Sequence, residues 1–310
     1  MIVVQLRPMT LDLSQRFVGS MLGLALGDAL GAKHEGGPLG AAAWWLLGLG
    51  KGDLLRWTDD TEMSVGLAAS LAERQGLDAD HLAMRWAQGM NPWRGYGPGA
   101  RKLLKRVLDG EDWRTANKAI FPEGSFGNGA AMRAAPIGLY YHRDMAALAK
   151  AAELAASITH AHPLGIEGGV LIARATALAM RDPFDAAGFL DELHGAAVAP
   201  EYRTRLATAR EWLASPPRPK EVRQKLGCSV LAHESAVTAV HAFCRHADDF
   251  DAMMRFIVEL GGDTDTIGAM AGGMFGAARG VDALPSPPLA LLESRAEIEM
   301  VAGRLREACG

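Results

Sequence analysis

Residues 261–280 read GGDTDTIGAMAGGMFGAARG, an acidic string followed directly by a long run of small and apolar residues. The run predicts a helix over Thr266–Arg279, with the carboxylates of Asp263 and Asp265 at its start. A second string of the same kind lies far earlier in the chain, where residues 57–73 read WTDDTEMSVGLAASLAE. The residues behind both strings are typical of a protein core, which makes a solvated surface an unfavourable explanation for the acidic residues.

The four carboxylates of these two strings indicate a metal site. If the two helix starts meet in space, four negative charges crowd into one pocket and repel one another. A bound hard cation removes this repulsion, and oxygen ligands from Asp and Thr suit Mg²⁺, Mn²⁺ or Ca²⁺ rather than zinc. The sequence therefore predicts a metal centre, most simply one for two ions.

The alternative is that both strings are ordinary helix caps. Asp, Thr and Ser are favoured at N-caps, and acidic first turns complement the helix dipole. One string alone would more often be a cap than a ligand set. Two such strings, each with paired carboxylates flanked by Thr, favour the metal site.

Composition indicates an ordinary globular protein with a small acidic excess. The 310 residues are 49% hydrophobic and 22% charged, with a net charge of -4. This balance argues against a nucleic-acid partner, because the most basic segment, Arg101–Arg106, also contains leucines and resembles the outer face of a helix. Three cysteines without CxxC spacing (Cys228, Cys244 and Cys309) indicate neither a disulfide framework nor a zinc knuckle. We expect a monomer in the reducing cytoplasm.

Residues 17–31, FVGSMLGLALGDALG, superficially resemble a signal peptide after Arg16. Asp28 interrupts the run, however, and no clear cleavage pattern follows it. The run is also too short and too interrupted to span a bilayer, so we expect no membrane association.

Helical periodicity dominates the chain and predicts an all-α fold. Gly19, Gly23 and Gly27 form a stripe of small residues four apart, which lets another helix approach closely. Only Met1–Leu6 suggests a strand. Because the two acidic strings must come together from opposite ends, we expect one compact multi-helix domain over residues 1–310. The predicted helices are Leu13–Leu30, Met63–Gln75, Asp80–Gln88, Gly99–Leu108, Ala130–Tyr141, Met145–Ser157, Ile166–Met180, Pro183–His194, Glu201–Ala214, Pro219–Leu226, Leu231–Arg245, Asp249–Leu260, Thr266–Arg279 and Leu289–Glu307.

Three further segments carry weaker signals. The loop GSFGNG at 124–129 can turn backbone N–H groups toward an anion, but it lacks a Walker lysine and follows no strand, so by itself it is an ordinary Gly-rich turn. The loop WRGYGPG at 93–99 suits either a pocket for a sugar or base or a simple connection. His160 and His162 lack further zinc ligands and suit a hydrogen-bonding group or a helix cap.

Taken together, these strings resemble the ADP-ribosylglycohydrolase family. They follow the family's order from about residue 16 to residue 281. The resemblance implies a compact all-α protein with a two-magnesium centre, Mn²⁺ being an alternative ion. The matching pieces are GxxxGxxxGDALG with Glu35, WTDDTEM, RGYGPG, GSFGNGAAMRAAPIG, ITHAHPLG, LAHESAVTAV and LGGDTDTIGAMAGGMFGA.

The resemblance also implies roles for individual residues. Glu35 would lie on a loop that closes over the scissile bond, and Glu35 and Asp263 would act in catalysis. The implied metal ligands are Thr58, Asp59, Asp60, Asp263, Asp265 and Thr266. The implied substrate-binding residues are Gly95, Tyr96 and Gly97 beside the ribose, Phe121, Gly124, Ser125, Phe126, Gly127 and Asn128 along the diphosphate and distal ribose, and His160.

The implied activity is magnesium-dependent removal of ADP-ribose from modified proteins, or from other ADP-ribose derivatives, by cleavage at the proximal ribose. The family's arginine-type branch carries an Asp in a DVGNT-like string where this chain reads Arg94-Gly95-Tyr96-Gly97. That string, SFGNGAAMR and HESAVTAV favour the branch that cleaves serine-linked ADP-ribose, poly(ADP-ribose) and O-acetyl-ADP-ribose. Cys228 and Ser229 depart from that branch, which has a Gly/Asn-containing turn there.

Three alternatives remain open at this point: an arginine-linked ADP-ribosyl hydrolase, a non-catalytic ADP-ribose-binding protein, and a two-metal phosphoesterase that would release AMP. Retention of all six ligand candidates together with Glu35 argues against the non-catalytic protein.

Overall fold

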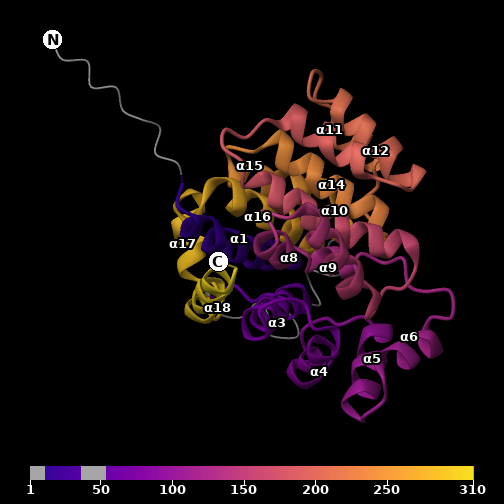
Figure 1. The fold of residues 1–310 in the computed structure, drawn as a ribbon. Helices are drawn as coiled ribbons and strands as arrows, with labels where there is room; N and C mark the ends of the chain where they lie inside the picture. The colour runs from indigo at the N-terminus through magenta and orange to yellow at the C-terminus, as the bar shows by residue number, and fades with distance from the viewer. Residues whose placement is uncertain (1–10, 36–53, 310) are drawn as a thin grey trace.

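The computed structural model describes residues 11–35 and 54–309. Within these residues the chain forms seventeen α-helices and one short 3₁₀ helix, η1, with no β-strand (Figure 1). The all-α prediction is confirmed, whereas the strand suggested for Met1–Leu6 lies outside the described residues. In chain order the helices are α1 (Leu13–Ala32), α3 (Asp59–Arg74), α4 (Ala79–Gly89), α5 (Pro98–Leu108), α6 (Trp113–Ile120), α7 (Gly129–Met132), α8 (Ala135–Tyr140), α9 (Met145–Ser157), α10 (Pro163–Ala179), α11 (Ala186–Ala196), α12 (Pro200–Glu211), α13 (Pro219–Lys225), α14 (Ala232–Arg245), α15 (Phe250–Leu260), α16 (Thr264–Arg279), η1 (Val281–Ala283), α17 (Ser286–Ala290) and α18 (Arg295–Ala308).

Helices α1 and α16 run antiparallel at the centre of the molecule, with their backbones in direct contact (Figure 1). A Cβ atom on Gly23 would lie 2.3 Å from the carbonyl oxygen of Gly272, and one on Gly27 would lie 2.0 Å from that of Gly268. Both distances are far shorter than a van der Waals contact, so only glycine fits at this crossing. The glycine stripe expected from the sequence is therefore the face that α1 turns toward α16.

The remaining helices surround this central pair. Helices α3 and α18 pack against α1, while α10 and α14 pack against α16. At one end of the α1–α16 pair, the Arg16 guanidinium donates 2.9 Å hydrogen bonds to the carbonyl oxygens of Ala277 and Ala278 in the last turn of α16. These carbonyls have no partner within their own helix, so the buried arginine satisfies them. Helices α5 and α6 lie at the outer edge of the molecule (Figure 1).

Two predicted helices are each divided in the structure. The segment Ala130–Tyr141 forms α7 and α8, because Pro136 lies in the first turn of α8, where its missing N–H is tolerated and a new helix can begin. The segment Leu289–Glu307 forms α17 and α18. Between them Leu292 makes an isolated β-bridge with Leu55, and Ser294 adopts a left-handed conformation with φ of 53°. Hydrophobic periodicity continues across both breaks and therefore did not reveal them.

Helix starts also differ from the prediction where they affect the acidic strings. Helix α3 begins at Asp59 and α16 at Thr264, earlier than the predicted Met63 and Thr266. The acidic residues therefore lie within or directly before the first helical turns. The short α6 was not predicted; it is started by Asp112, whose carboxylate accepts from the backbone N–H groups of Arg114 and Thr115.

The contact between α1 and α16 predicts a strong effect of one methyl group. We expect Gly27→Ala to lower the free energy of unfolding by about 3 kcal/mol or more, because the added Cβ forces the two backbones apart. Denaturant-induced unfolding followed by circular dichroism measures the change.

The matched control is Gly303→Ala in α18, where a Cβ meets no atom within 4 Å. This change should be neutral or stabilise the protein by up to about 1 kcal/mol, because alanine favours the helix. Equal unfolding midpoints for the two variants would contradict the packing argument.

Candidate functional site

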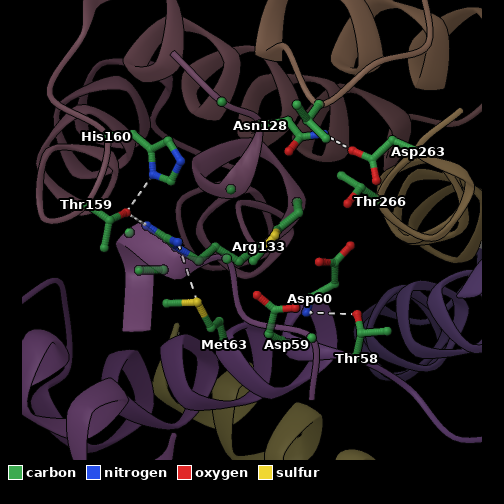
Figure 2. A pocket seen from close by; sticks show the side chains of 18 of the residues that line it. Thr58, Asp59, Asp60, Met63, Asn128, Arg133, Thr159, His160, Asp263 and Thr266 are labelled. Atoms are coloured by element: carbon green, nitrogen blue, oxygen red, sulfur yellow. Dashed lines mark hydrogen bonds between the residues drawn. The ribbon is translucent and has the colours of Figure 1, made fainter. Parts of the chain in front are cut away.

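The starts of α3 and α16 lie at one cavity of about 550 Å³ (Figure 2). Asp59 and Asp60 line it from α3, and Asp263 and Asp265 line it from the start of α16. The hydroxyl-bearing residues Thr58 and Thr266 also line it. The two acidic strings, which are about two hundred residues apart in sequence, therefore contribute to the same site.

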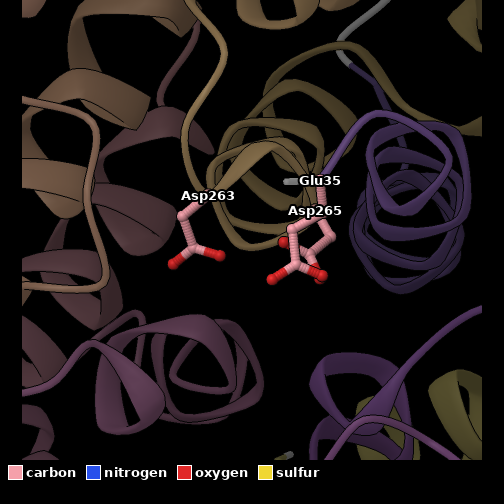
Figure 3. Close-up of side chains that lie close together, drawn as sticks. All are labelled: Glu35, Asp263 and Asp265. Carbon is pink, nitrogen blue, oxygen red and sulfur yellow. The ribbon is translucent and has the colours of Figure 1, made fainter. Parts of the chain in front are cut away.

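Glu35 reaches this cavity from the turn that follows α1. One carboxylate oxygen from each of Glu35, Asp263 and Asp265 lies within 4.8 Å of the others (Figure 3). Although Glu35 as a residue is exposed, its carboxyl group faces two buried aspartates. Partial burial, and then the charge of Asp263, raises the pKa of Glu35.

A buried aspartate of α1 holds the start of α3 in place. The carboxylate of Asp28 accepts hydrogen bonds from the backbone N–H of Thr58 at 3.0 Å and of Thr61 at 3.1 Å, and from the Thr61 hydroxyl at 2.6 Å. Burial raises the pKa of Asp28 to about 6. Because these donors belong to the first turn of α3, Asp28 fixes Asp59 and Asp60 relative to α1.

The helix-cap alternative accounts for Thr58 but not for the orientation of the Asp263 carboxylate. The Thr58 hydroxyl accepts from the Asp60 backbone N–H at 3.3 Å, as an N-cap does. Asp263 occupies the N-cap position of α16 without a side-chain capping bond. Its carboxylate instead accepts from the side-chain amide of Asn128, which also donates to the Ser235 hydroxyl at 3.0 Å. Asn128 therefore orients Asp263 toward the cavity.

The carboxylates repel one another strongly. Burial, and then the charges of Asp28 and Asp59, raises the pKa of Asp60 well above its usual value. Burial, and then the charge of Asp60, does the same for Asp265. Burial raises the pKa of Asp59 to about 7. Such a cluster costs folding free energy unless protons or a cation neutralise it.

The donor set fits a hard divalent cation. All the candidate ligand atoms are oxygens of carboxylates and hydroxyls, which Mg²⁺, Mn²⁺ and Ca²⁺ prefer. The Oδ2 atom of Asp60 is buried and has no hydrogen-bond partner. A buried acceptor without a donor is unfavourable, so this oxygen is suited to bind a cation.

A cationic and a neutral side chain form the opposite wall of the cavity (Figure 2). The buried Arg133 donates to the Thr159 hydroxyl at 2.6 Å and lies 4.2 Å from the centroid of the Trp86 ring. Burial lowers its pKa to about 10, so it remains charged at neutral pH. The Nδ1 atom of His160 lies 2.7 Å from the same hydroxyl, and burial lowers the pKa of His160 to about 3. The wall therefore presents a positive charge and a neutral imidazole.

The loop after α4 is held beside the buried carboxylates. The carbonyl oxygen of Arg94 accepts a hydrogen bond from the Asp59 backbone N–H at 2.8 Å, and the Arg94 guanidinium forms a 2.7 Å ion pair with Glu293. Gly95 and Gly97 consequently line the cavity. Tyr96 does not: its buried hydroxyl donates to Glu62 at 2.8 Å, on the far side of the loop.

The loop before α7 supplies a further wall. Phe121, Ser125, Gly127 and Asn128 line the cavity, as does Gly129. The loop is pinned to residues 230–232, since the Asn128 backbone N–H donates to the carbonyl oxygen of Val230 at 2.9 Å.

Two nominated residues of the same loop do not line the cavity. Gly124 has a φ of 79°, and its missing side chain lets the backbone of His162 approach. Phe126 is 45% exposed and packs its ring against that of His162. His162 itself caps α10 by accepting from the Leu164 backbone N–H.

Two important residues of the site were not selected from the sequence. Asp28 carried a visible signal, because a carboxylate inside an apolar, Gly-rich helix must be buried and paired. Arg133 lies in the segment GSFGNGAAMR, and an arginine among small apolar residues before Pro136 was a comparable signal.

No helix in the described part of the chain is both long and apolar enough to cross a membrane.

The carboxylate cluster predicts stabilisation by divalent cations. We expect millimolar Mg²⁺ or Mn²⁺ to raise the thermal midpoint of the wild-type protein by about 5 °C or more, because a cation that binds only the folded state adds its binding free energy. Differential scanning fluorimetry measures the shift, with NaCl at equal ionic strength as control. Asp60→Asn should remove most of the rise; equal responses to Mg²⁺ and NaCl in the wild type would refute the cation site.

The chain is similar to known proteins over nearly its whole length. The family model ADP-ribosylglycohydrolase matches residues 9–310. The protein ADP-ribosylhydrolase ARH3 of Homo sapiens is 32% identical over 337 residues, which cover 94% of this chain and 92% of that protein. The corresponding ARH3 of Mus musculus is 31% identical over 336 residues, covering 94% and 90%.

A further relative and a solved structure extend the comparison. An uncharacterised protein of Archaeoglobus fulgidus is 33% identical over 309 residues, covering 95% of this chain and 97% of that protein. The solved structure of an ADP-ribosylglycohydrolase-related protein complex superposes with a TM-score of 0.74 at 30% identity, covering 96% of this chain and 99% of that one. The chain therefore belongs to the ADP-ribosylglycohydrolase family and is a hydrolase of glycosidic bonds to ADP-ribose.

Proposed function

We propose that this protein is a magnesium-dependent hydrolase that removes ADP-ribose from modified proteins by cleaving the glycosidic bond at the proximal ribose. The observation that carries the proposal is the cluster of buried carboxylates from α3 and α16 with Glu35 beside it. The adjoining cavity, of about 550 Å³, lies within the size range of small-molecule sites.

Six residues would hold two Mg²⁺ ions, or Mn²⁺ ions, at this cluster. When bound, such ions orient the ribose hydroxyls and lower the pKa of a water molecule. Residues of α3 would contribute from one side and residues of α16 from the other. The proposed ligands are Thr58, Asp59, Asp60, Asp263, Asp265 and Thr266.

Glu35 and Asp263 would move the protons of the reaction. Glycosidic cleavage proceeds through an oxocarbenium-like transition state, in which the leaving oxygen gains a proton and a water molecule loses one. Asp263 is held by Asn128 and would accept the proton of the attacking water. Glu35, with its raised pKa, would protonate the leaving oxygen and assist the same water.

The opposite wall would bind the diphosphate and the distal ribose. Arg133 already donates to the Thr159 hydroxyl, so the hydroxyl proton is free to point at Nδ1 of His160. That arrangement leaves the imidazole proton on Nε2, beside Gly127 and Gly129, where it would donate to a substrate oxygen. The first turn of α5, from Gly97 to Ala100, adds backbone N–H groups and a favourable helix dipole for an anion.

The remaining nominated residues would act by shaping these walls. Gly95 and Gly97 would leave space beside the proximal ribose, while Tyr96 would brace their loop from behind. Phe121 and Ser125 would face the substrate directly. Gly124 and Phe126 would hold their loop against the start of α10.

The preferred linkages would be serine-linked ADP-ribose, poly(ADP-ribose) and O-acetyl-ADP-ribose. Support comes from the Arg94-Gly95-Tyr96-Gly97 string, which contains no carboxylate where the arginine-type branch carries an Asp, and from the relatives named ARH3. Arginine-linked ADP-ribose remains the second candidate linkage.

Removal of a single carboxylate tests the catalytic site. We expect Asp60→Ala and Asp263→Ala each to lower kcat by roughly 100-fold or more while the protein stays folded, because each loses cation binding and transition-state charge stabilisation. Release of ADP-ribose from a modified peptide in Mg²⁺ gives the rate, and circular dichroism reports folding. Full activity in either variant would be incompatible with the assignment.

A panel of substrates tests the reaction and the linkage. Serine-linked, arginine-linked, O-acetyl and polymeric ADP-ribose should separate by at least tenfold in kcat/KM, about 1.4 kcal/mol, with the arginine linkage cleaved most slowly. Chromatography identifies the product. Intact ADP-ribose supports glycosidic cleavage, AMP would identify a phosphoesterase, and binding without any product would identify a non-catalytic ADP-ribose-binding protein.

A further inference from the structure

A second hollow, which the proposed chemistry does not use, lies on the outer face of α5. We call it the α5 groove. Its volume is about 420 Å³, close to that of a small-ligand site. The helix contributes four cations and one carboxylate, and the end of α6 contributes an apolar side chain. The residues that line it are Arg101, Lys102, Lys105, Arg106, Asp109 and Ile120.

The α5 groove adjoins the main cavity along both of its walls. On α5, Ala100 lines the cavity and the next residue, Arg101, lines the groove. On the segment that follows α6, Phe121 lines the cavity and the preceding residue, Ile120, lines the groove. The Phe121 ring packs on Gly99, where a Cβ would lie 2.1 Å from Cζ. This ring and the first turn of α5 therefore form the partition between the two hollows.

The groove lies near the part of the cavity that would hold the end of the substrate away from the scissile bond. The catalytic carboxylates lie at the start of α16 in the centre of the molecule, whereas α5 and α6 lie at its outer edge (Figure 1). The cavity continues from the carboxylates to Phe121 and the first turn of α5. In the proposed binding mode, with the proximal ribose at the carboxylates, the diphosphate and adenosine would therefore lie toward Phe121 and the partition. A group attached to the adenosine ribose would leave the cavity beside the α5 groove.

Two of the four cations in the groove are available for a ligand. Lys105 pairs with Asp109 at 3.0 Å, and Arg106 pairs with Glu111 through two hydrogen bonds of 2.5 and 2.8 Å. In the part of the chain that the structure describes, Arg101 and Lys102 form no ion pair, and both are exposed. Two uncompensated cations beside an apolar floor suit an anion that also carries an apolar portion, as a nucleotide does.

We propose that the α5 groove binds a second, phosphate-bearing nucleotide unit attached to the adenosine ribose of the ADP-ribose unit in the cavity. This proposal rests on the proposed function. Its substrate class is an ADP-ribose chain that continues beyond the unit being cleaved, since each further unit of such a polymer is joined through that ribose. Arg101 and Lys102 contact the diphosphate of the second unit, and Ile120 supports its apolar part.

Charge reversal in the groove tests this assignment. The test variant is Arg101→Glu/Lys102→Glu, and the matched control is Arg203→Glu/Arg304→Glu, which makes the same change at exposed positions on α12 and α18. Fluorescence anisotropy measures binding of labelled ADP-ribose oligomers of defined length, with metal chelated so that no turnover occurs. Unlabelled monomeric ADP-ribose is measured by competition.

We expect the test variant to bind oligomers about tenfold more weakly than the wild type at low salt, with the difference shrinking as salt screens the charges. Its affinity for monomeric ADP-ribose should stay within about twofold, and the control should change neither value. Equal weakening of oligomer and monomer, no weakening of either, or a wild type that binds oligomers no better than monomer would overturn the proposal. Equally effective competition by a poly-glutamate peptide would also overturn it, by showing a general polyanion surface.

The binding test of the α5 groove and the activity test of the proposed function can fail independently. A wild type that releases no ADP-ribose from any substrate in Mg²⁺ would refute the catalytic proposal, whereas the binding comparison in chelator would still decide the role of the α5 groove. In an active wild type, the test variant should raise KM for polymer about tenfold and leave kcat/KM for a singly modified peptide unchanged. A uniform loss on both substrates would count against the groove.

Discussion

Direct backbone contact between α1 and α16 sets the positions of the helices and side chains around them. Glycines four residues apart on both helices allow an approach that any side chain at Gly27 or Gly268 would prevent. Because the helices are antiparallel, the end of α1 lies beside the start of α16. Glu35 thereby meets Asp263 and Asp265, although more than two hundred residues separate them in sequence.

Electrostatic repulsion at this meeting point opposes folding, and the surrounding structure holds the charges there. Asp28 is satisfied by the first turn of α3, and Asp263 by the amide of Asn128. Asp60 retains a buried oxygen without a donor. This is the pattern expected of a site whose geometry is maintained for binding a cation, because a purely structural cluster would pair or lose these charges. Arg133 on the opposite wall offsets part of the negative charge without touching the carboxylates.

The walls of the cavity differ in how they are held. The carboxylates proposed for catalysis are held by helix packing, whereas the segments proposed for substrate recognition are mostly loops. The aspartates stand at the starts of α3 and α16, where Asp60, Asp263 and Asp265 are buried and packing fixes their positions. The surfaces proposed for substrate recognition are the first turn of α5 and the loops 93–97 and 121–129, which are held by hydrogen bonds and ring contacts. Loops on a rigid scaffold can vary in sequence while the catalytic centre is preserved. The α5 groove extends the recognition surface outward from the partition formed by Phe121.

The helical class, the glycine stripe and the two acidic strings could all be read from the sequence, because each is a local pattern whose period or composition follows from backbone geometry. For His160 and His162 the sequence left a hydrogen-bonding group or a helix cap open, and the roles of the loops at 95–97 and 124–129 came from the family resemblance. Which loop residues face the cavity depends on long-range packing: Tyr96 points to Glu62, and Phe126 packs on His162. The bonding of Asp28 to α3, the division of the segment 130–141 and the stack of Arg133 on Trp86 likewise depend on contacts between distant segments. A local pattern specifies what a residue can do, whereas the packing of remote helices decides which partner it meets.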